Sequence, residues 1–499
     1  MFRTTHAVTL FEHLRIPYSA DLPRAAPDGA SLLDSGFARV QLAASSAVTG
    51  GSAVAGGAAT DGPSVWWPHR ENQVADRTPR IVSSLLGDIP LYTRVVPDAA
   101  LAPLLASEAR GWEPAKSLRD SAGRQISSVW RADDGSLLVP FDPDEAIETL
   151  WSERYTESSA AGAGRVLRRL GLATYYRLRP LMPRAVQLAL RREFTRVQGR
   201  TSFPRWPVEP ALHDLFRYMV TMLADFAAAP IPWIQPWPAP YAWCLSLTHD
   251  VETEAGLMRL TAVRDLEMHA GVRSVWNFVP RRYEVPPSLV EELLADGFEV
   301  GVHGLYHDGR DLESWTTLQA RLPAMHESAA LWQARGFRAP STHRRWEWVP
   351  VLGFDYDSSY PDTDPYEPQP GGCCSWFPFF IGGTVELPIT LPQDHTLFTI
   401  LRHADERLWV DKCQRIRARQ GLALLLAHPD YLLQHEDLAM YERFLRAFAD
   451  DSGAWRPLPH EIAAWWRRRD ASTLEIRDGA WRVVGPAAEE AQVSLEPPA

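Results

Sequence analysis

Ionisable side chains follow several apolar runs in the second half of the chain. LSLT is followed by His249, Asp250 and Glu252, and FEVGV is followed by His303, with His307 four residues further on. Neutral imidazoles and a carboxylate are the ligands of open sites for Zn²⁺ and similar divalent ions, in which water takes the remaining position. Two histidines at i and i+4 can bind one ion from one face of a turn. These residues predict a divalent metal site, for Zn²⁺ first and for Co²⁺ or Ni²⁺ as alternatives.

Each of these positions also has an ordinary structural explanation. An acid after a strand commonly caps the next helix, two histidines four apart arise by chance, and a histidine after an apolar run can be a core residue. Arg338 in GFRAP and His428 in LALLLAHPDY extend the pattern to two further apolar runs. If these runs are parallel strands, their carboxyl ends meet at one edge of the sheet. The joint placement therefore favours one site over several separate structural roles.

These residue types suit the hydrolysis of an amide. The reaction needs an attacking water, stabilisation of an oxyanion and a proton for the departing amine, and a metal ion serves the first two needs. Asp250 is the candidate base, Arg338 would hold it ionised, and His428 is the candidate acid because its unperturbed pKa is near neutrality. Asp357 or Asp430 is a candidate partner for His428, although Asp357 also suits a turn in YDSSYPDTDP.

Alternating segments must position these residues. Strand-like segments and helix-like segments take turns along the chain, at 243–250, 255–270, 274–279, 287–296, 298–303 and 314–335. This alternation is typical of parallel strands covered by helices, in an α/β barrel or a doubly wound sheet, and ligands bind at the carboxyl ends of such strands. Five prolines at 230–240 predict a linker in front of this domain, because proline removes backbone donors and favours extended chain.

The remaining segments are predicted to form smaller units. In the first 229 residues, an accessory α/β region, we expect a hairpin around Asp134-Gly135 and a helix capped by Asp142. The segment 40–62, rich in Gly, Ala and Ser, is predicted to be flexible. The expected order is an accessory region 1–229, a linker 230–240, a domain 241–470, and a C-terminal hairpin and tail 471–499 with its turn at Asp478-Gly479.

Charge narrows the possible partners. The 499 residues carry a formal net charge of -11, which argues against nucleic-acid binding because phosphate affinity comes from clustered Lys and Arg. Between Arg165 and Arg200, however, ten arginines accompany a single acid, Glu193. We expect a solvated helical face there, with peripheral contact to an anionic membrane surface or polymer as the alternative. A core-facing stripe at helical spacing supports the helix, and it consists of Val186, Leu190, Phe194 and Val197.

Cysteine usage and the N-terminus bear on the compartment. The four cysteines, Cys244, Cys373, Cys374 and Cys413, show no CxxC pairing, which favours reduced thiols. MFRTTHAVTLFEHLRIPYSADL lacks the apolar core of a signal peptide, and no stretch reaches the roughly 18 apolar residues of a membrane span. We therefore expect a cytoplasmic protein. Twenty tryptophans, whose faces can stack on sugar rings, make carbohydrate a candidate partner.

The chain resembles the polysaccharide deacetylase family, carbohydrate esterase family 4, over residues 240–470. Five segments are similar to the family's motifs and follow one another in the same order: THDVE, HGLYH, FRAPS, LGFDYDSS and LLLAH. A further segment resembles an extra N-terminal region of some bacterial members, and its sequence is LLVPFDPDEAIETLWSERY. The resemblance implies a distorted (β/α) barrel. It also implies a hydrolase of non-peptide carbon–nitrogen bonds that removes N-acetyl groups from a polysaccharide or glycan intermediate, with removal of O-acetyl groups as the less favoured alternative.

The resemblance also implies individual roles. The base would be Asp250, oriented by Arg338, the acid His428, and the metal ligands Glu252, His303 and His307. Family members have two adjacent Asp, whereas Val251 separates the acids here, so Asp250 and Glu252 can have exchanged roles. STHRRW departs from the usual end of the third motif, and the substrate-binding candidates are His343, Trp346 and Asp357.

Two other functions stay open. The first is hydrolysis of a linear or cyclic non-sugar amide, since related members with separated acids act on such compounds. The second is a carbohydrate-binding protein without catalysis, against which the retained acids and histidines speak. Without a signal peptide, a cytoplasmic precursor in exopolysaccharide biosynthesis is the favoured substrate.

Overall fold

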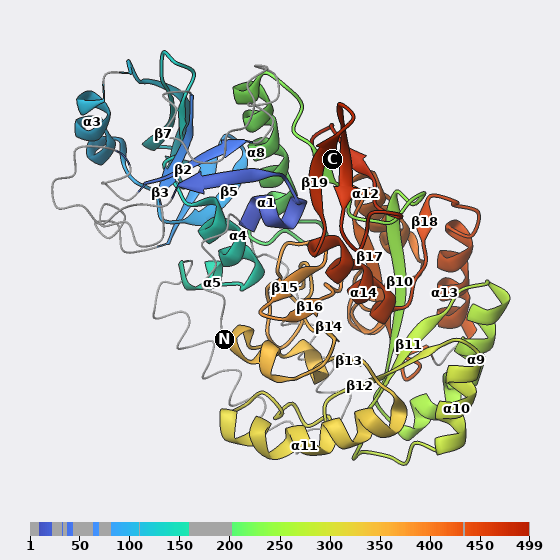
Figure 1. Cartoon of the computed structure of the whole chain (residues 1–499). Helices are drawn as coiled ribbons and strands as arrows, with labels where there is room; N and C mark the ends of the chain where they lie inside the picture. Colours follow the sequence, from blue (N-terminus) through green and yellow to red (C-terminus); the bar gives the residue numbers. More distant parts are fainter. Residues whose placement is uncertain are drawn as a thin grey trace.

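The computed structural model describes residues 9–21, 32, 37–42, 63–68, 81–108, 110–158, 202–432 and 435–498. The predicted basic segment Arg165–Arg200, with its apolar stripe, lies outside the described residues. So do residues 43–62 of the predicted flexible segment, whereas residues 40–42 belong to a strand. Two sheets organise the described chain, and α1 and α8 lie between them (Figure 1).

The N-terminal sheet has eight strands in the order β1-β2-β3-β8-β7-β6-β4-β5. Neighbours are antiparallel except β3 and β8. The strands are β1 (Tyr18–Asp21), β2 (Phe37–Leu42), β3 (Val65–Pro68), β4 (Val82–Leu86), β5 (Ile89–Thr93), β6 (Glu113–Asp120), β7 (Gln125–Arg131) and β8 (Leu137–Leu138). The helices around them are α1 (Thr9–Leu14), α3 (Asp98–Ser107), α4 (Pro143–Trp151), α5 (Tyr155–Ser158) and α8 (Ala211–Ala227).

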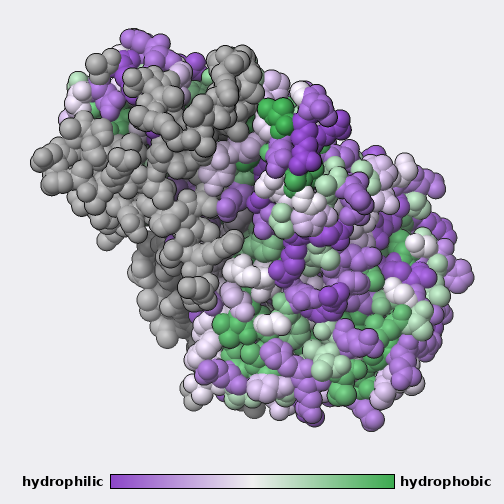
Figure 2. Space-filling model, viewed as in Figure 1, coloured by the Kyte–Doolittle hydropathy of each residue, from purple (hydrophilic) through white to green (hydrophobic). Residues whose placement is uncertain are grey.

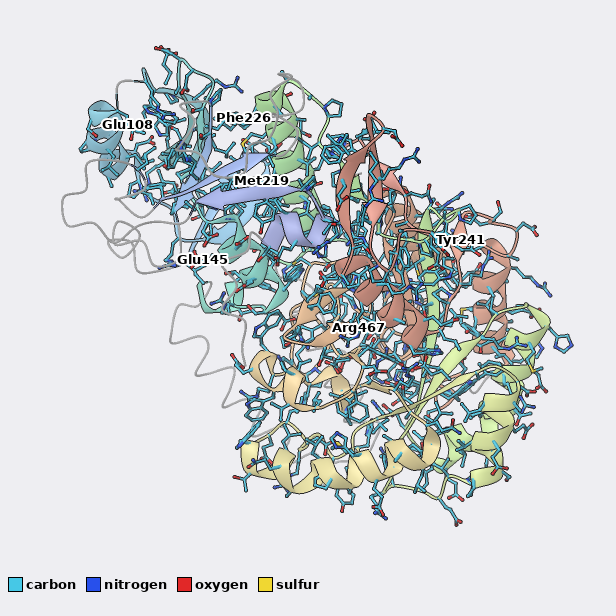
Figure 3. The ribbon with its side chains drawn as sticks, viewed as in Figure 1. Glu108, Glu145, Met219, Phe226, Tyr241 and Arg467 are labelled. Carbon is cyan, nitrogen blue, oxygen red and sulfur yellow. The ribbon has the colours of Figure 1, made fainter. Side chains whose placement is uncertain are left out.

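The hairpin and the helix cap that the sequence predicts in this region are both present. β7 and β8 form the hairpin around Asp134-Gly135, where Gly135 has a φ of 86°. The Asp142 carboxylate accepts a hydrogen bond from the backbone N–H of Asp144 and so caps α4. Met219 of α8, labelled in Figure 3, is fully buried.

The C-terminal sheet has the order β15-β16-β14-β13-β12-β11-β10-β17, with β18 also beside β10. All pairs are parallel except β15 with β16. The strands are β10 (Trp243–Val251), β11 (Ser274–Phe278), β12 (Glu299–Val302), β13 (Gly336–Phe337), β14 (Tyr356–Asp357), β15 (Phe379–Ile381), β16 (Thr384–Glu386), β17 (Leu422–Ala427) and β18 (Ala454–Trp455). Every residue of β10, β11, β12 and β17 is buried, as expected for parallel strands covered on both faces.

Helices connect and cover these parallel strands. The first three fall where the alternation predicts them. The helices are α9 (Glu254–His269), α10 (Pro287–Ala295), α11 (Trp315–Trp332), α12 (Arg407–Ala418), α13 (His435–Ala447) and α14 (Pro459–Asp470), with short turns η3 (Pro340–Thr342) and η4 (Trp346–Val351) and a π-helix η5 (His395–Leu401). None of the helices in the described part of the chain has the length and apolar character to span a membrane.

The predicted barrel is present as an open, mostly parallel sheet. The sheet ends at β15 on one side and β17 on the other, and no strand pair among the described residues joins these edges. The segment after β16 does reach β17, because Thr390 N and Leu391 N donate to Leu424 O at 3.2 and 3.0 Å. The mixed α/β class is confirmed, whereas a closed (β/α) barrel is not. Alternation of strands and helices predicts parallel pairing but does not determine whether the two edges of the sheet meet.

The predicted linker 230–240 is a packed part of the joint between the two halves. Within it, β9 (Trp233–Ile234) pairs with β21 (Val493–Ser494), and Trp237 donates its indole N–H to Gln420 O at 2.6 Å. One continuous core contains apolar residues of α1, α8, β17 and α14. Proline-rich composition predicted the extended chain but not its burial, because burial depends on the elements that pack around it.

The remaining C-terminal segment ends in a hairpin. β19 (Thr473–Arg477) and β20 (Ala480–Val484) pair across Asp478-Gly479, and both turn residues have positive φ, 53° and 73°. This is the turn geometry expected for Asp-Gly. The four cysteines are free thiols and all are buried. On the face shown in Figure 2, hydrophilic residues dominate the C-terminal half and hydrophobic residues show in groups between them.

Candidate metal centre

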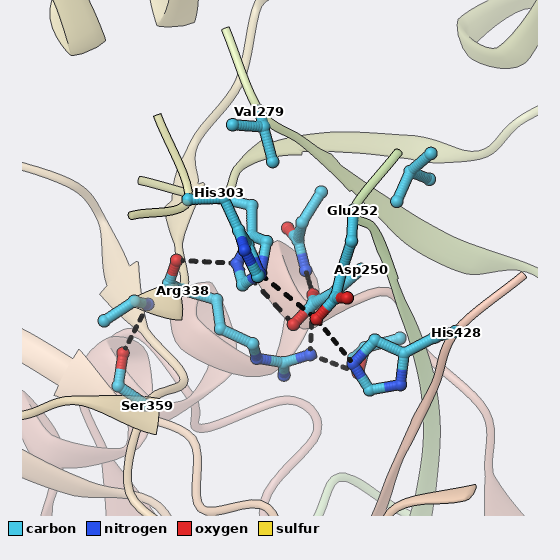
Figure 4. A network of polar contacts seen from close by, with 12 residues as sticks. Asp250, Glu252, Val279, His303, Arg338, Ser359 and His428 are labelled. Atoms are coloured by element: carbon cyan, nitrogen blue, oxygen red, sulfur yellow. Dashed lines mark hydrogen bonds and ion pairs between the residues drawn. The ribbon is translucent and has the colours of Figure 1, made fainter. Parts of the chain in front are cut away.

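Two strand ends and one loop bring together three metal-ligand candidates. Glu252 follows β10, His303 follows β12, and His307 lies in the loop from β12 to α11. One ligand atom of each residue lies within 4.8 Å of the others. β10, β11 and β12 are parallel neighbours, so their carboxyl ends meet at one edge. Figure 4 shows Glu252 and His303 side by side, with Asp250, Arg338 and His428 around them.

The loop turns sharply to bring His307 back to this edge. His307 and Gly304 both have positive φ, 54° and 62°. A Cβ at residue 304 would lie 2.3 Å from Asp311 Oδ2 and 2.6 Å from Pro340 Cγ. Glycine is therefore required at this position, both for its backbone conformation and for the close approach of the neighbouring chain.

Two imidazole nitrogens in this cluster are available as ligands. His303 donates from Nδ1 to Arg338 O at 3.0 Å, which leaves a lone pair on Nε2. His303 Nε2 is buried and has no hydrogen-bond partner among the described residues, whereas His307 Nε2 contacts the Glu252 carboxylate. Burial, partly offset by Asp250, lowers the pKa of His303 to about 4, so this ring is neutral at pH 7. A buried nitrogen without a partner is costly, and a cation would satisfy it.

Glu252 lies directly against this pair of histidines. Its Oε1 is 3.1 Å from His307 Nε2, and its Oε2 accepts a hydrogen bond from Tyr431 Oη at 2.8 Å. Burial opposes its ionisation, but the hydrogen bond and charge of His307, with His428 nearby, hold the pKa of Glu252 well below its ordinary value. Glu252 is therefore an ionised carboxylate at neutral pH and can serve as a metal ligand.

Asp250 occupies a deeper position behind Glu252. Its Oδ1 accepts from Asn277 Nδ2 at 2.8 Å and lies 3.3 Å from an Arg338 nitrogen, while Oδ2 is 3.6 Å from His303 Nδ1. The Asp250 side chain is 2% exposed, against 17% for Glu252. Burial raises the pKa of Asp250, but the charges of His303 and Arg338 outweigh burial, so the pKa lies below its ordinary value. The two acids therefore differ in partners and in access to solvent.

Arg338 is held on several sides. Its guanidinium donates to Thr248 Oγ1, Ser358 O and Ser358 Oγ, each at 2.7 Å, in addition to its contact with Asp250. The side chain is almost fully buried. A guanidinium with this many fixed acceptors has little freedom, so it presents a constant positive charge to Asp250.

His428 forms an ion pair with a residue that sequence reasoning did not single out. Asp394, at the start of η5, accepts from His428 Nδ1 and from the His428 backbone N–H, both at 2.7 Å. His428 Nε2 is 4.0 Å from Glu252 Oε1. Burial disfavours the charged ring, but Asp394 outweighs it and raises the pKa of His428 to about 10. His428 is therefore protonated at neutral pH and faces the metal-ligand cluster.

Neither of the acids predicted to partner His428 hydrogen-bonds to it. Asp430 accepts from Glu252 N at 2.9 Å and from Thr253 Oγ1 at 2.5 Å, so it holds the chain that follows β10. Asp357 accepts from Ser359 Oγ at 2.6 Å and lies beside Glu386, and burial raises its pKa to about 6. The sequence offered one signal for Asp394, a polar residue after the apolar stretch ELPITLP. This signal is weak because no regular strand directly precedes Asp394.

The predicted substrate-binding residues make their contacts with residues outside the cluster. His343 donates a hydrogen bond from Nδ1 to Gly309 O at 3.1 Å, and Trp346 packs on Tyr360 and Phe379. Asp357 is buried, and the Arg338 charge acts on its carboxylate. His249 faces the opposite side of β10 and binds Glu267 at 2.7 Å, as strand alternation requires. The structure thus brings together six of the predicted site residues: Asp250, Glu252, His303, His307, Arg338 and His428. It does not bring His343, Trp346 and Asp357 into this cluster.

Searches against known proteins give similarities to about half of this chain. No protein-family model matches the chain, and no curated protein matches it. A Mycobacterium smegmatis protein assigned to the polysaccharide deacetylases is 17% identical, with a TM-score of 0.40, over 50% of this chain and 97% of its own. The PuuE allantoinase is 17% identical, with a TM-score of 0.37, over 47% of this chain and 93% of its own.

A family 4 carbohydrate esterase from Streptomyces lividans, solved in complex with acetate, is also similar. It is 16% identical, with a TM-score of 0.28, over 42% of this chain and 90% of its own. Solved polysaccharide deacetylases are thus among the structures to which this chain is similar.

Proposed function

We propose that this protein is a metal-dependent hydrolase that removes N-acetyl groups from a polysaccharide or glycan intermediate. The observation that carries the proposal is the meeting of Glu252 with the imidazole nitrogens of His303 and His307, beside Asp250 and a charged His428. Of these nitrogens, His303 Nε2 is buried and has no hydrogen-bond partner among the described residues. This combination supplies a cation site, a base and an acid within one strand-end cluster.

Glu252, His303 and His307 would hold the metal ion, for which we propose Zn²⁺, with Co²⁺ or Ni²⁺ as alternatives. When bound, such an ion acidifies a water molecule and polarises a carbonyl oxygen. Three nitrogen and carboxylate donors with further positions open are the set expected for a catalytic zinc. Glu252 is the better ligand of the two acids because Arg338 and Asn277 already engage Asp250.

The side chains then have distinct tasks in amide hydrolysis. Asp250 accepts a proton from the attacking water through Oδ2, the oxygen that Asn277 and Arg338 leave open. The water oxygen bonds to the acetyl carbon. His428 Nε2 donates a proton to the nitrogen as the C–N bond breaks, which releases acetate and a free amine. Arg338 keeps Asp250 ionised, and Asp394 keeps His428 protonated.

The glycan substrate is proposed from the five ordered motifs that resemble the polysaccharide deacetylases. In this proposal, residues 241–470 are the catalytic domain, of the distorted (β/α) barrel type. Residues 1–229 are then the accessory region of a bacterial member, and the substrate is a cytoplasmic intermediate of exopolysaccharide biosynthesis. A linear or cyclic non-sugar amide is the alternative, because Val251 separates the two acids.

The test is metal content together with acetate release from a panel of N-acetylated sugars. We expect about one metal ion per chain and acetate release in the wild type, and loss of both in His303→Ala. His403→Ala is the matched control, because His403 is an exposed histidine outside the cluster. It should retain both properties.

The outcomes separate the alternatives. Metal binding with ring opening of a cyclic amide, and no acetate from any sugar, would favour the non-sugar amide. Full metal content in His303→Ala would contradict the proposed ligand set. A chain that binds neither metal nor any amide substrate would contradict the hydrolase assignment.

A further inference from the structure

A buried ion pair connects the N-terminal region to the chain that follows β13. Glu153, in the turn between α4 and α5, accepts from Arg344 Nε at 3.0 Å and from Arg344 Nη2 at 2.6 Å. Both side chains are buried, and the Arg344 guanidinium also lies over the Tyr360 ring at 5.6 Å. A bidentate pair of this kind restrains both partners, and removal of one partner leaves a buried charge.

Arg344 also hydrogen-bonds to a turn that has an unusual backbone conformation. Ser341 and Thr342 are consecutive residues with positive φ, 55° and 49°, and neither is glycine. Non-glycine residues persist in this region only where surrounding contacts over-determine it. Arg344 Nη1 donates to Thr342 O at 2.8 Å, and its other donors go to Glu153. The ion pair thus restrains the strained turn directly.

The same turn connects to both sides of the candidate metal centre. Three residues before Ser341, Arg338 contacts Asp250 with its side chain and accepts the His303 Nδ1 hydrogen bond with its carbonyl. One residue after Thr342, His343 bonds to Gly309 O in the loop that carries His307. A shift of this turn would therefore move the groups that orient the base and two metal ligands.

We propose that Glu153 is a positioning residue for the metal centre, and that it acts through Arg344 on the turn at Ser341-Thr342. The part of the N-terminal region that carries Glu153 then belongs to the working site and is not a separable attachment. Tyr155 supports the same role, because its hydroxyl donates to Gly372 O at 2.8 Å and accepts from Gly372 N at 2.9 Å. The catalytic consequence rests on the proposed function, whereas the structural consequence does not.

The experiment compares the full chain with Glu153→Gln and with a matched control, Glu145→Gln. Glu145 is an equally buried acid of α4, labelled in Figure 3, but it binds Arg94 and Thr93 within the N-terminal region. Hydrogen exchange of peptides covering 339–345 and 303–311 should be about ten-fold faster in Glu153→Gln only. The visible spectrum of the Co²⁺-loaded protein should change in this variant, and kcat should fall about ten-fold.

Each outcome decides the proposal. Unchanged exchange of 339–345 in Glu153→Gln, or an equal increase in both variants, would overturn it. If the wild type releases no acetate, the proposed function fails, but hydrogen exchange still decides the positioning role. If Glu153→Gln does not fold, Arg344→Lys takes its place, because one ammonium group cannot bond to Glu153 and to Thr342 O in the same geometry. It should show the same faster exchange, and unchanged exchange would again overturn the role.

Discussion

The two sheets of this protein are similar in size but differ in what their strand ends carry. In the mostly parallel C-terminal sheet, strands β10, β11, β12, β13 and β17 end at one edge, and Asp250, Asn277, His303, Arg338 and His428 lie at or just after these ends. In the mostly antiparallel N-terminal sheet, neighbouring strands run in opposite directions, so the ends of its described strands are divided between two edges. Parallel topology is thus what concentrates the chemistry.

Buried acids show the same contrast. Glu145, beside the N-terminal sheet, is fully engaged by Thr93 and by the side chain and backbone of Arg94. Glu252, at the parallel edge, lies in a cluster in which His303 Nε2 is buried and has no hydrogen bond among the described residues. A paired acid stabilises the fold, whereas an acid beside an unpaired nitrogen marks a binding site.

The largest expected effects test the division of labour between the two acids at the parallel edge. Asp250→Asn and Glu252→Gln should each lower kcat by about 10³-fold, because one removes the base and the other a ligand. Only Glu252→Gln should lose the metal, as measured by elemental analysis after dialysis. Metal loss in Asp250→Asn with retention in Glu252→Gln would show that the two roles are exchanged.

The next largest effect is expected at Asp394, which keeps His428 protonated. Asp394→Asn should lower kcat by about 10²-fold and move the alkaline limb of the pH profile to lower pH. The direction follows from the pKa of His428, which Asp394 raises to about 10. Activity needs the protonated ring, so it is lost as pH rises through this pKa, and without Asp394 that loss comes earlier. An alkaline limb at the same pH in the variant would exclude His428 as the acid.

A smaller effect is expected at the joint that unites the two regions. Arg469 of α14 donates to three carbonyl oxygens, those of His13 at 2.8 Å, Ile234 at 2.6 Å and Gln235 at 3.0 Å. Arg469→Met should lower the free energy of unfolding by about 3 kcal/mol, because these buried acceptors lose their donor. Urea denaturation measures the change.

Arg467, labelled in Figure 3, offers the matched control. It lies on the same helix and also donates to two carbonyl oxygens, those of Gly383 and Asp355, but at the exposed surface. Arg467→Met should cost less than about 1 kcal/mol. Equal losses in the two variants would contradict a special role of Arg469 at the joint.

The smallest effect is an acid sensitivity of the same joint. His213 of α8 accepts a hydrogen bond from Trp376 N at 2.9 Å, and burial lowers its pKa to about 3. Its contribution to stability is complete above the unfolded pKa of about 6.5 and is lost as pH falls toward 3, because the unfolded state takes up the proton first. Between pH 7.5 and pH 5 the wild type should lose about 2 kcal/mol more than His213→Gln, whose side chain retains an acceptor but does not titrate. Parallel pH dependences of the two proteins in urea denaturation would contradict this.

Local sequence signals determined the elements and their order. The strand and helix alternation from 243 to 335, the cap at Asp142, and the turns at Asp134-Gly135 and Asp478-Gly479 all appear where the sequence predicts them. These features depend on side-chain periodicity and backbone preference over a few residues, so they can be read without knowledge of the rest of the molecule.

The sequence by itself also determined which ionisable residues follow the apolar runs, and hence the six that meet at the parallel edge. Only the tertiary structure decided that Asp394, and neither Asp357 nor Asp430, holds His428, and that residues 231–238 of the proline-rich segment are mostly buried. It also decided that Glu153 reaches Arg344, 191 residues further along the chain. These contacts depend on how distant segments pack, and short-range periodicity carries no information about which distant partners meet.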